Sequence, residues 1–485
     1  MKKLLCAILS AVMLSGCAAA PVQTVPATSA PTESTATHWQ LEKGGLEILS
    51  PDGMAENAIT TEKTKDHTIV RINAPGTYIL SGRLEAGQIA VDLGENAKDD
   101  PNAVVTLILD GLDITCTDAP AVIFYNVYES GEPGGQDGAN VILADGSWND
   151  VNGSHTEEYD GALYSRMSMT LDGGGSLSIT ADNEGLCSEM HLTVNGGEIT
   201  IESGNDGINT NADGVSVTTI NGGSLNIRVT GETGEGDGID SNGALVINGG
   251  TIHAFACGSS DDAGIDADKG ISINGGTVCA TGNMIDRIDE NSQTHAVFTF
   301  ADPQKPGIYT LKNAAGETVM ELNAENTFRN LILSAPALTE GTYTLWTGDT
   351  QFEGMVGAGG GFFGELQPIE GPDWPGRDDG RVEIPPQPTQ PIVTHGTVVM
   401  IPEGERPADM PVPQLPEGSE GQMPVPPMPQ EGADLPATQL PEGVEPPRDG
   451  FGRHPIGDTV IVGILSTDFQ LKPGANYFTS LRPVA

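Results

Sequence analysis

The sequence has little positive charge. Its 485 residues include 22 Lys and Arg against 67 Asp and Glu, so the formal net charge is −45. Coulomb repulsion therefore disfavours nucleic acid and anionic membrane surfaces as partners. Cations, neutral ligands and ligands bridged by a cation remain compatible with this charge.

Aromatic residues are also scarce, at 5%, whereas glycine occurs 64 times. This composition argues against a helical bundle and indicates many tight turns. Cysteines are few, and the four beyond the N-terminal segment lack the spacing of a zinc site or a dense disulfide framework. We expect these four to be small hydrophobic residues, mostly unpaired, with one disulfide as the alternative: Cys116, Cys187, Cys257 and Cys279.

The N-terminus has the features of a secretory leader. Basic Lys2 and Lys3 precede an apolar stretch, residues 4–14, that is too short to span a bilayer. The sequence Leu-Ser-Gly-Cys that ends at Cys17 resembles the bacterial lipobox. It predicts a signal peptide over 1–16, lipidation of Cys17, and lipid anchoring to the extracellular face of the bacterial membrane. The alternative is a plain secretory peptide in which Cys17 is incidental.

Two low-complexity segments divide the rest of the chain. Residues 17–40 are rich in Ala, Pro, Thr and Ser, which is typical of a flexible tether. Residues 357–457 are rich in Pro, Gly and Glu, and 17 of the 34 prolines lie between positions 381 and 450. Such a segment cannot bury a core, so we predict a disordered insertion there. It would interrupt a C-terminal β cap formed by residues 291–356 and 458–485.

The centre of the chain is repetitive. Asn-Gly-Gly begins at positions 195, 221, 248 and 274, at intervals of 26, 27 and 26 residues, and an acidic residue followed by Gly and an apolar residue precedes most copies. Short β-type runs at this period are typical of one rung of a parallel β-helix. We therefore predict an all-β solenoid over residues 60–290. A calcium-binding β-roll would need a nine-residue period, which the sequence lacks.

Stacking the repeats aligns both apolar and acidic positions. Three columns are entirely apolar, as the inside of a tube requires: Val194, Ile220, Ile247 and Ile273; Ile199, Leu225, Ile252 and Val278; and Leu186, Ile208, Ile239 and Ile265. Carboxylates that repeat every rung, about 4.8 Å apart, repel one another unless protonated or bridged by a cation. Calcium accepts such oxygen ligands, so we predict a calcium site among Asp206, Asn209, Asp237, Asp240, Asp262, Asp266 and Asp268. The alternative is that these residues cap turns and face water.

Other residues suggest two further roles. Parallel β-helices host polysaccharide lyases that combine calcium with a basic side chain, and the candidates for that base are Lys269, Arg228 and Arg287. Exposed aromatic rings can stack on sugars, and Trp148, Tyr159 and Tyr164 are our candidates for such a platform. Packing in the core or a cap is the alternative for these aromatic residues.

Several segments together resemble a bacterial family of carbohydrate-binding β-helix lipoproteins, formerly a domain of unknown function. They are residues 74–82, 105–111, 161–165 and 341–348, with the Asp-Gly-Ile and Asn-Gly-Gly repeats. The resemblance implies a right-handed parallel β-helix, bound calcium, and binding of cellulose or acidic sugars such as polygalacturonate without demonstrated cleavage. We therefore expect a monomeric, non-catalytic polysaccharide-binding protein. A calcium-dependent pectate-type lyase and a surface adhesin or structural protein are the alternatives.

Overall fold

The computed structural model describes residues 36–42, 45–357 and 465–484, and its regular structure is almost entirely β. The described strands form a 24-stranded and an 8-stranded sheet, with one short 3-10 helix, η1 (Ala97–Asp99). The predicted all-β class is therefore confirmed. The predicted signal peptide, Cys17, most of the tether and nearly all of the Pro-rich insertion lie outside the described residues.

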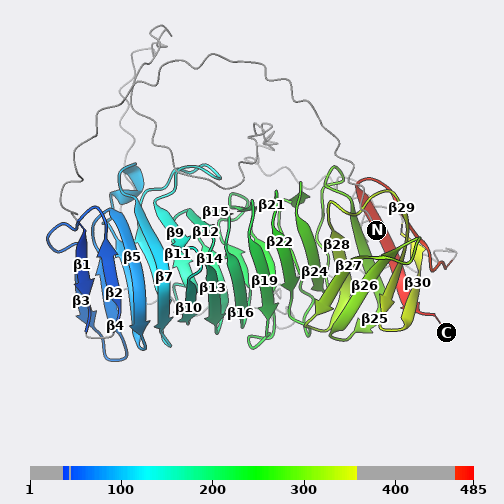
Figure 1. Cartoon of the computed structure of the whole chain (residues 1–485), viewed down its shortest axis with the longest axis horizontal. Coiled ribbons are helices and arrows are strands. Elements are labelled where there is room, and N and C mark those ends of the chain that lie inside the picture. The colour runs from blue at the N-terminus through cyan, green and yellow to red at the C-terminus, as the bar shows by residue number, and fades with distance from the viewer. Residues whose placement is uncertain (1–35, 43–44, 358–464, 485) are drawn as a thin grey trace, which may run out of the picture. The chain divides into compact units, whose positions relative to one another are not determined.

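Parallel strands stack in three columns through the middle of the chain, where neighbouring rungs lie side by side (Figure 1). Column 1 contains β9 (Ala139–Leu143), β12 (Met169–Gly173), β15 (Leu192–Val194), β18 (Val217–Ile220), β21 (Ala244–Ile247) and β23 (Ile271–Ile273). Column 2 contains β5 (Gly76–Leu84), β7 (Val105–Thr115), β10 (Trp148–Gly153), β13 (Ser176–Ala181), β16 (Glu198–Ser203), β19 (Ser224–Val229), β22 (Thr251–Phe255) and β24 (Thr277–Gly282). Column 3 contains β4 (Thr68–Ile72), β6 (Gly87–Asp92), β8 (Val122–Asn126), β11 (Gly161–Ser165), β14 (Glu184–Ser188), β17 (Ile208–Thr210) and β20 (Ile239–Ser241).

The strand register confirms the three predicted apolar columns. Val194 pairs with Ile220, Ile220 with Ile247, and Ile247 with Ile273 along column 1, and the other two sets align in the same way along columns 2 and 3. All twelve side chains are buried in one hydrophobic cluster. Alternate residues of a strand point to opposite faces, and in the column 2 strands β10, β16 and β19 one face fills the core while the other is more exposed.

The Asn-Gly-Gly corners stack on one another from rung to rung. The side-chain amide of each Asn donates to Oδ1 of the Asn one rung earlier, at 2.9 Å for the three successive pairs from Asn195 to Asn274. Positive φ falls on the second glycine, with +87° at Gly223, rather than on the Asn. A Cβ at Gly223 would lie 2.9 Å from the Gly197 carbonyl oxygen, so both the turn and the close approach of rungs require glycine.

Antiparallel strands lie at both ends of the stack. At the N-terminal end, β1 (Thr37–Gln40) pairs with β2 (Glu47–Ser50), and β3 (Ile59–Lys63) pairs with β4. The C-terminal segments form β25 (His295–Gln304), β26 (Gly307–Asn313), β27 (Thr318–Ala324), β28 (Phe328–Ser334), β29 (Gly341–Thr347), β30 (Thr350–Val356), β31 (Phe469–Leu471) and β32 (Ala475–Pro483). β28 pairs with the last column 2 strand, β24, which covers an edge that could otherwise pair with another chain.

A second core, rich in aromatic side chains, packs among the C-terminal strands. Phe298, Phe300, Phe328, Phe352 and Phe478 are fully or almost fully buried there, and Phe255 and Cys279 from the last rungs join the cluster. The C-terminal strands therefore pack on the rungs through apolar contacts.

Candidate functional site: a buried acidic ladder

An acidic ladder runs along column 3, where strands β14, β17 and β20 begin. Glu184 starts β14, while Asp206 and Asp237 lie two residues before the starts of β17 and β20. Asn209 pairs in register with Asp240, and the Ile239–Ile265 bridge places Asp266 one rung further on. The Asp-Gly-Ile repeat explains this placement, since the isoleucine fills the core and fixes the register of the acidic residues.

The ladder brings three carboxylates into one cluster. One carboxylate oxygen from each of Asp237, Asp240 and Asp266 lies within 4.8 Å of the others. Backbone N–H groups hold neighbouring carboxylates in place. The N–H of Asp237 donates to Asp206 Oδ1 at 2.7 Å, and the N–H of Ala263 donates to Asp237 Oδ1 at 2.5 Å.

Two buried oxygens of the ladder have no hydrogen-bond partner among the described residues. Asn209 donates its side-chain amide to Glu184 Oε1 at 2.8 Å, which leaves Glu184 Oε2 and Asn209 Oδ1 unpaired. Glu184 is 5% exposed and Asn209 8% exposed, so bulk water does not satisfy either oxygen. Unpaired buried acceptors are costly, and a proton or a cation would satisfy them.

Burial dominates the electrostatics of the ladder. It raises the pKa of Glu184 to about 7, and with the Asp206 charge it raises the pKa of Asp237 to about 9. Burial and then the Asp268 charge raise the pKa of Asp240 to about 6, while burial and then the Asp286 charge raise that of Asp266 to about 7. Without a cation, several of these carboxyls are therefore protonated near neutral pH.

The remaining predicted ligands lie in different settings. Asp206 is buried beside the cluster, and burial raises its pKa well above the ordinary value. Asp262 is half-buried and accepts from the Gly236 N–H at 2.7 Å and from the Ser260 hydroxyl. Asp268 is exposed.

Asp286 belongs to the ladder but is absent from the predicted ligands. It is half-buried, accepts from the Ala267 N–H at 3.1 Å, and is the neighbouring charge with the largest effect on Asp266. Burial raises the pKa of Asp286 itself. A signal was present in the sequence, because Asp286 follows the last Asn-Gly-Gly corner at almost the spacing at which Asp206 follows the first.

Of the three basic residues considered for lyase chemistry, Arg228 lies apart from Lys269 and Arg287. Arg228 lies on β19 in column 2, where Glu202 and Glu325 bind its guanidinium at 2.6 and 3.6 Å. Lys269 is exposed in the turn before β23. Arg287 is exposed nearby and donates to the Lys269 carbonyl at 3.5 Å.

The three aromatic candidates do not form one platform. Trp148, at the start of β10, is 76% exposed, whereas Tyr164 on β11 is 1% exposed and donates its hydroxyl to Glu189. Tyr159 is half-buried, with its ring centroid 5.4 Å from those of Tyr125 and Tyr164. The prediction that Tyr164 offers a ring face to a ligand is therefore wrong, because core packing covers the ring.

A groove of about 300 Å³ crosses the rungs at the ends of column 2 strands. Its lining includes hydroxyl, amide and carboxylate side chains from successive rungs, among them Thr115, Asn152, Thr180, Asp182, Glu202 and Thr230. Register pairs Asn152 with Thr180 and Thr180 with Glu202, so the groove continues the exposed face of β10, β13 and β16.

The four described cysteines are buried, and none of them forms a disulfide. Burial raises the pKa of Cys116 to about 11 and that of Cys279 to about 12. Among the described residues, no helix is long and apolar enough to cross a membrane.

Fold and site together define an all-β protein of stacked parallel strands with a partly buried ladder of carboxylate and amide side chains. A family model described as carbohydrate-binding domain-containing protein matches residues 66–297, which include all three columns and the ladder. A carbohydrate-binding domain-containing protein of Acetivibrio thermocellus is 31% identical over 135 residues, which are 28% of this chain and 45% of that protein. The chain thus matches less than half the length of this relative.

A solved structure of a polysaccharide lyase-like protein from C. thermocellum, a gadolinium derivative, is also similar. Its sequence identity is 24% and its TM-score 0.34, with 46% of this chain and 84% of that chain covered.

Proposed function

We propose that the protein binds polysaccharide without cleaving it, through a right-handed parallel β-helix that calcium stabilises. The match of residues 66–297 to a carbohydrate-binding family supports this ligand class. The three parallel columns around one apolar core support a closed solenoid. Cellulose and acidic sugars such as polygalacturonate are the candidate ligands.

The donor set of the acidic ladder fits calcium. Calcium takes six to eight oxygens from carboxylates, amides and carbonyls in flexible geometry. Asp237, Asp240 and Asp266 would supply carboxylates, and the unpaired oxygens of Glu184 and Asn209 lie in the same ladder. When bound, the ion would neutralise carboxylates that otherwise repel one another, and so stabilise the rungs.

The exposed face of column 2 is the proposed sugar-binding surface, and Trp148 is the observation that supports it best. Trp148, Asp150 and Asn152 alternate with buried residues along β10 and so share its exposed face. The exposed indole lies at one end of that face, and Asn152 lines the groove at the other. An aromatic face with rows of hydroxyls and amides provides stacking and hydrogen bonds for a glycan chain.

Arg228 is poorly placed to act as a lyase base. A lyase base must be free to remove a proton beside the metal, whereas Arg228 is held by two carboxylates on column 2. The net charge of −45 would repel a polyuronate, so that ligand would need a bridging cation, while neutral cellulose would not.

The remaining features of the proposal come from the leader and the charge. We propose that Cys17 carries a lipid that anchors the chain to the extracellular face of the bacterial membrane. We propose further that the protein is a monomer. We also propose that it does not bind nucleic acid, because its negative charge would repel the phosphates.

Retention on immobilised cellulose and polygalacturonate, with and without a chelator, tests the function. We expect Trp148→Ala to weaken binding by roughly threefold to tenfold, the range of one aromatic contact. Ile308→Ala is the matched control, because Ile308 is an exposed apolar residue on β26, far along the chain from the proposed face. If Trp148→Ala were retained on the polysaccharide as well as the parent protein, the exposed face of column 2 would not be the sugar-binding surface. Release of unsaturated, ultraviolet-absorbing oligouronides would instead identify a lyase.

A further inference from the structure

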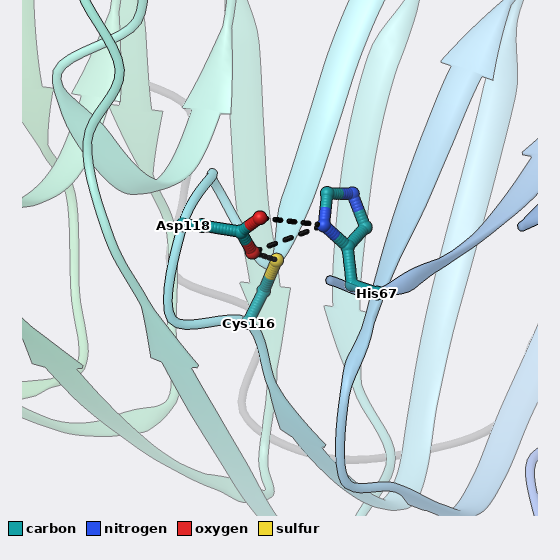
Figure 2. Close-up of side chains that lie close together, drawn as sticks. All are labelled: His67, Cys116 and Asp118. Atoms are coloured by element: carbon teal, nitrogen blue, oxygen red, sulfur yellow. Dashed lines mark hydrogen bonds and ion pairs between the residues drawn. The ribbon is translucent and has the colours of Figure 1, made fainter. Parts of the chain in front are cut away.

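A second cluster of metal-ligating side chains lies apart from the acidic ladder. Figure 2 shows His67, Cys116 and Asp118 converging, with the His67 imidazole and the Cys116 sulfur both directed at the Asp118 carboxylate. His67 Nδ1 lies 3.0 Å from Asp118 Oδ1, and Cys116 Sγ lies 3.5 Å from the same oxygen. His67 occupies the turn before β4, while Cys116 and Asp118 directly follow β7.

The three ligand atoms are close enough to share one ion. The sulfur, the imidazole nitrogen and a carboxylate oxygen all lie within 4.8 Å of one another. The cluster is buried on one side, since Cys116 is 1% exposed and the His67 side chain 10% exposed. The Asp118 side chain is 38% exposed, which leaves solvent access to the carboxylate and a route for an ion.

The second nitrogen of His67 can hold the proton that a metal would displace. Nδ1 lies 3.0 Å from a carboxylate oxygen of Asp118, which can only accept, so without a metal Nδ1 carries the proton. A metal at Nδ1 would replace that proton, and the imidazole would then hold its proton on Nε2. Within the described residues, the buried Nε2 has no hydrogen-bond partner that would oppose this change.

The donor set distinguishes among metals. Thiolate and imidazole are ligands for zinc and related transition metals, whereas calcium and magnesium select oxygen. Zinc accepts sulfur, nitrogen and carboxylate oxygen in one tetrahedral site, and three protein ligands leave a fourth position for water or a ligand group. We propose that His67, Cys116 and Asp118 form a zinc-type divalent-metal site, separate from the proposed calcium ladder.

Sequence spacing gave no sign of this site. His67 and Asp118 are 51 residues apart, and only Cys116 and Asp118 are close neighbours in sequence. The parallel pairing of β4 with β6 and of β6 with β8 brings the turn before β4 beside the turn between β7 and β8.

Cobalt titration of the chelator-treated full chain tests the proposal. Cobalt bound through a thiolate gives a near-ultraviolet charge-transfer band that oxygen-only sites cannot produce. We expect this band to saturate at one ion per chain, to disappear when one equivalent of zinc is added, and to persist in excess calcium. Persistence in calcium separates this site from the ladder, so failure of either proposal leaves the other standing.

Two variants and one control assign the ligands. Cys116→Ser should abolish the charge-transfer band, and Asp118→Asn should weaken cobalt affinity roughly tenfold or more. Asp118→Asn alters a partly exposed group and keeps an accepting oxygen, so it tests the site even if Cys116→Ser fails to fold. Cys257→Ser removes another buried cysteine and should leave the band unchanged. Absence of the band in the parent protein, or its survival in Cys116→Ser or at full strength in Asp118→Asn, would overturn the proposal.

Discussion

Replacing Asp237 with asparagine should have opposite effects in the absence and presence of calcium. Asn is nearly isosteric with Asp and keeps an oxygen that can accept from the Ala263 N–H. Without calcium, the variant loses a half-buried charge, or the need to protonate the carboxyl that carries it. With calcium, the variant loses a charged ligand. A purely structural turn residue would not produce this reversal.

The magnitude follows from the shifted pKa of Asp237. The pKa is about 9 in the folded state against an ordinary value of 3.8. At pH 7 the folded carboxyl is therefore protonated, while the unfolded one is ionised. Taking up that proton costs about 4 kcal/mol, at about 1.4 kcal/mol for each pH unit above 3.8. We expect Asp237→Asn to recover part of this free energy in chelator, which at roughly 2 °C per kcal/mol is a rise in Tm of up to about 8 °C.

Calcium should then stabilise the variant much less than the parent protein. At a calcium concentration 100 times Kd, binding stabilises the parent by about 2.7 kcal/mol. If the lost carboxylate weakens binding about 100-fold, the same concentration stabilises the variant by only about 0.4 kcal/mol. Thermal unfolding of both proteins, in chelator and across a calcium titration, measures these increments.

Asp110→Asn provides the matched control. Asp110 is exposed on β7, outside the ladder, so its substitution should change neither the Tm in chelator nor the calcium increment. A lower Tm of Asp237→Asn in chelator would refute the argument that the buried charge destabilises the fold. A full calcium increment in that variant would show that Asp237 is not a ligand.

Three further predictions concern the ladder, the corners and the aromatic residues. Because the pKa values of Glu184, Asp237 and Asp266 are raised, the folded state binds more protons than the unfolded state between about pH 4 and 9. In chelator, Tm should therefore fall as pH rises over that range, and calcium should flatten the slope. A Tm in chelator that rises with pH over that range would contradict this prediction. Asn221→Ala removes two side-chain hydrogen bonds and should cost about 1–2 kcal/mol in urea unfolding, whereas an unchanged midpoint would show that the stacked amides add no stability. Tyr164→Phe should leave polysaccharide retention unchanged, because the ring is buried, and a loss of retention would restore Tyr164 as a ligand contact.

Local sequence determined the β class, the rung period and the core register. An isoleucine or valine recurs at fixed distances from each Asn-Gly-Gly corner, so burying one row of these side chains aligns every other column. The acidic ladder follows from the same alignment, which is why the sequence alone indicated Asp206, Asp237, Asp240 and Asp266. Trp148, whose side chain is exposed, was also identifiable as a candidate from sequence.

Tertiary structure decided what the repeat does not encode. Burial of Tyr164, the pairing of Arg228 with Glu325 and the entry of Asp286 into the ladder depend on irregular loops and C-terminal strands. The meeting of His67 with Cys116 and Asp118 depends on the pairing of β4 with β6 and of β6 with β8, which brings His67 and Asp118 together across 51 residues. Periodicity fixes which residues share a column, because every rung repeats the same backbone geometry. Contacts outside that period depend on packing between segments distant in sequence, and no local pattern specifies them.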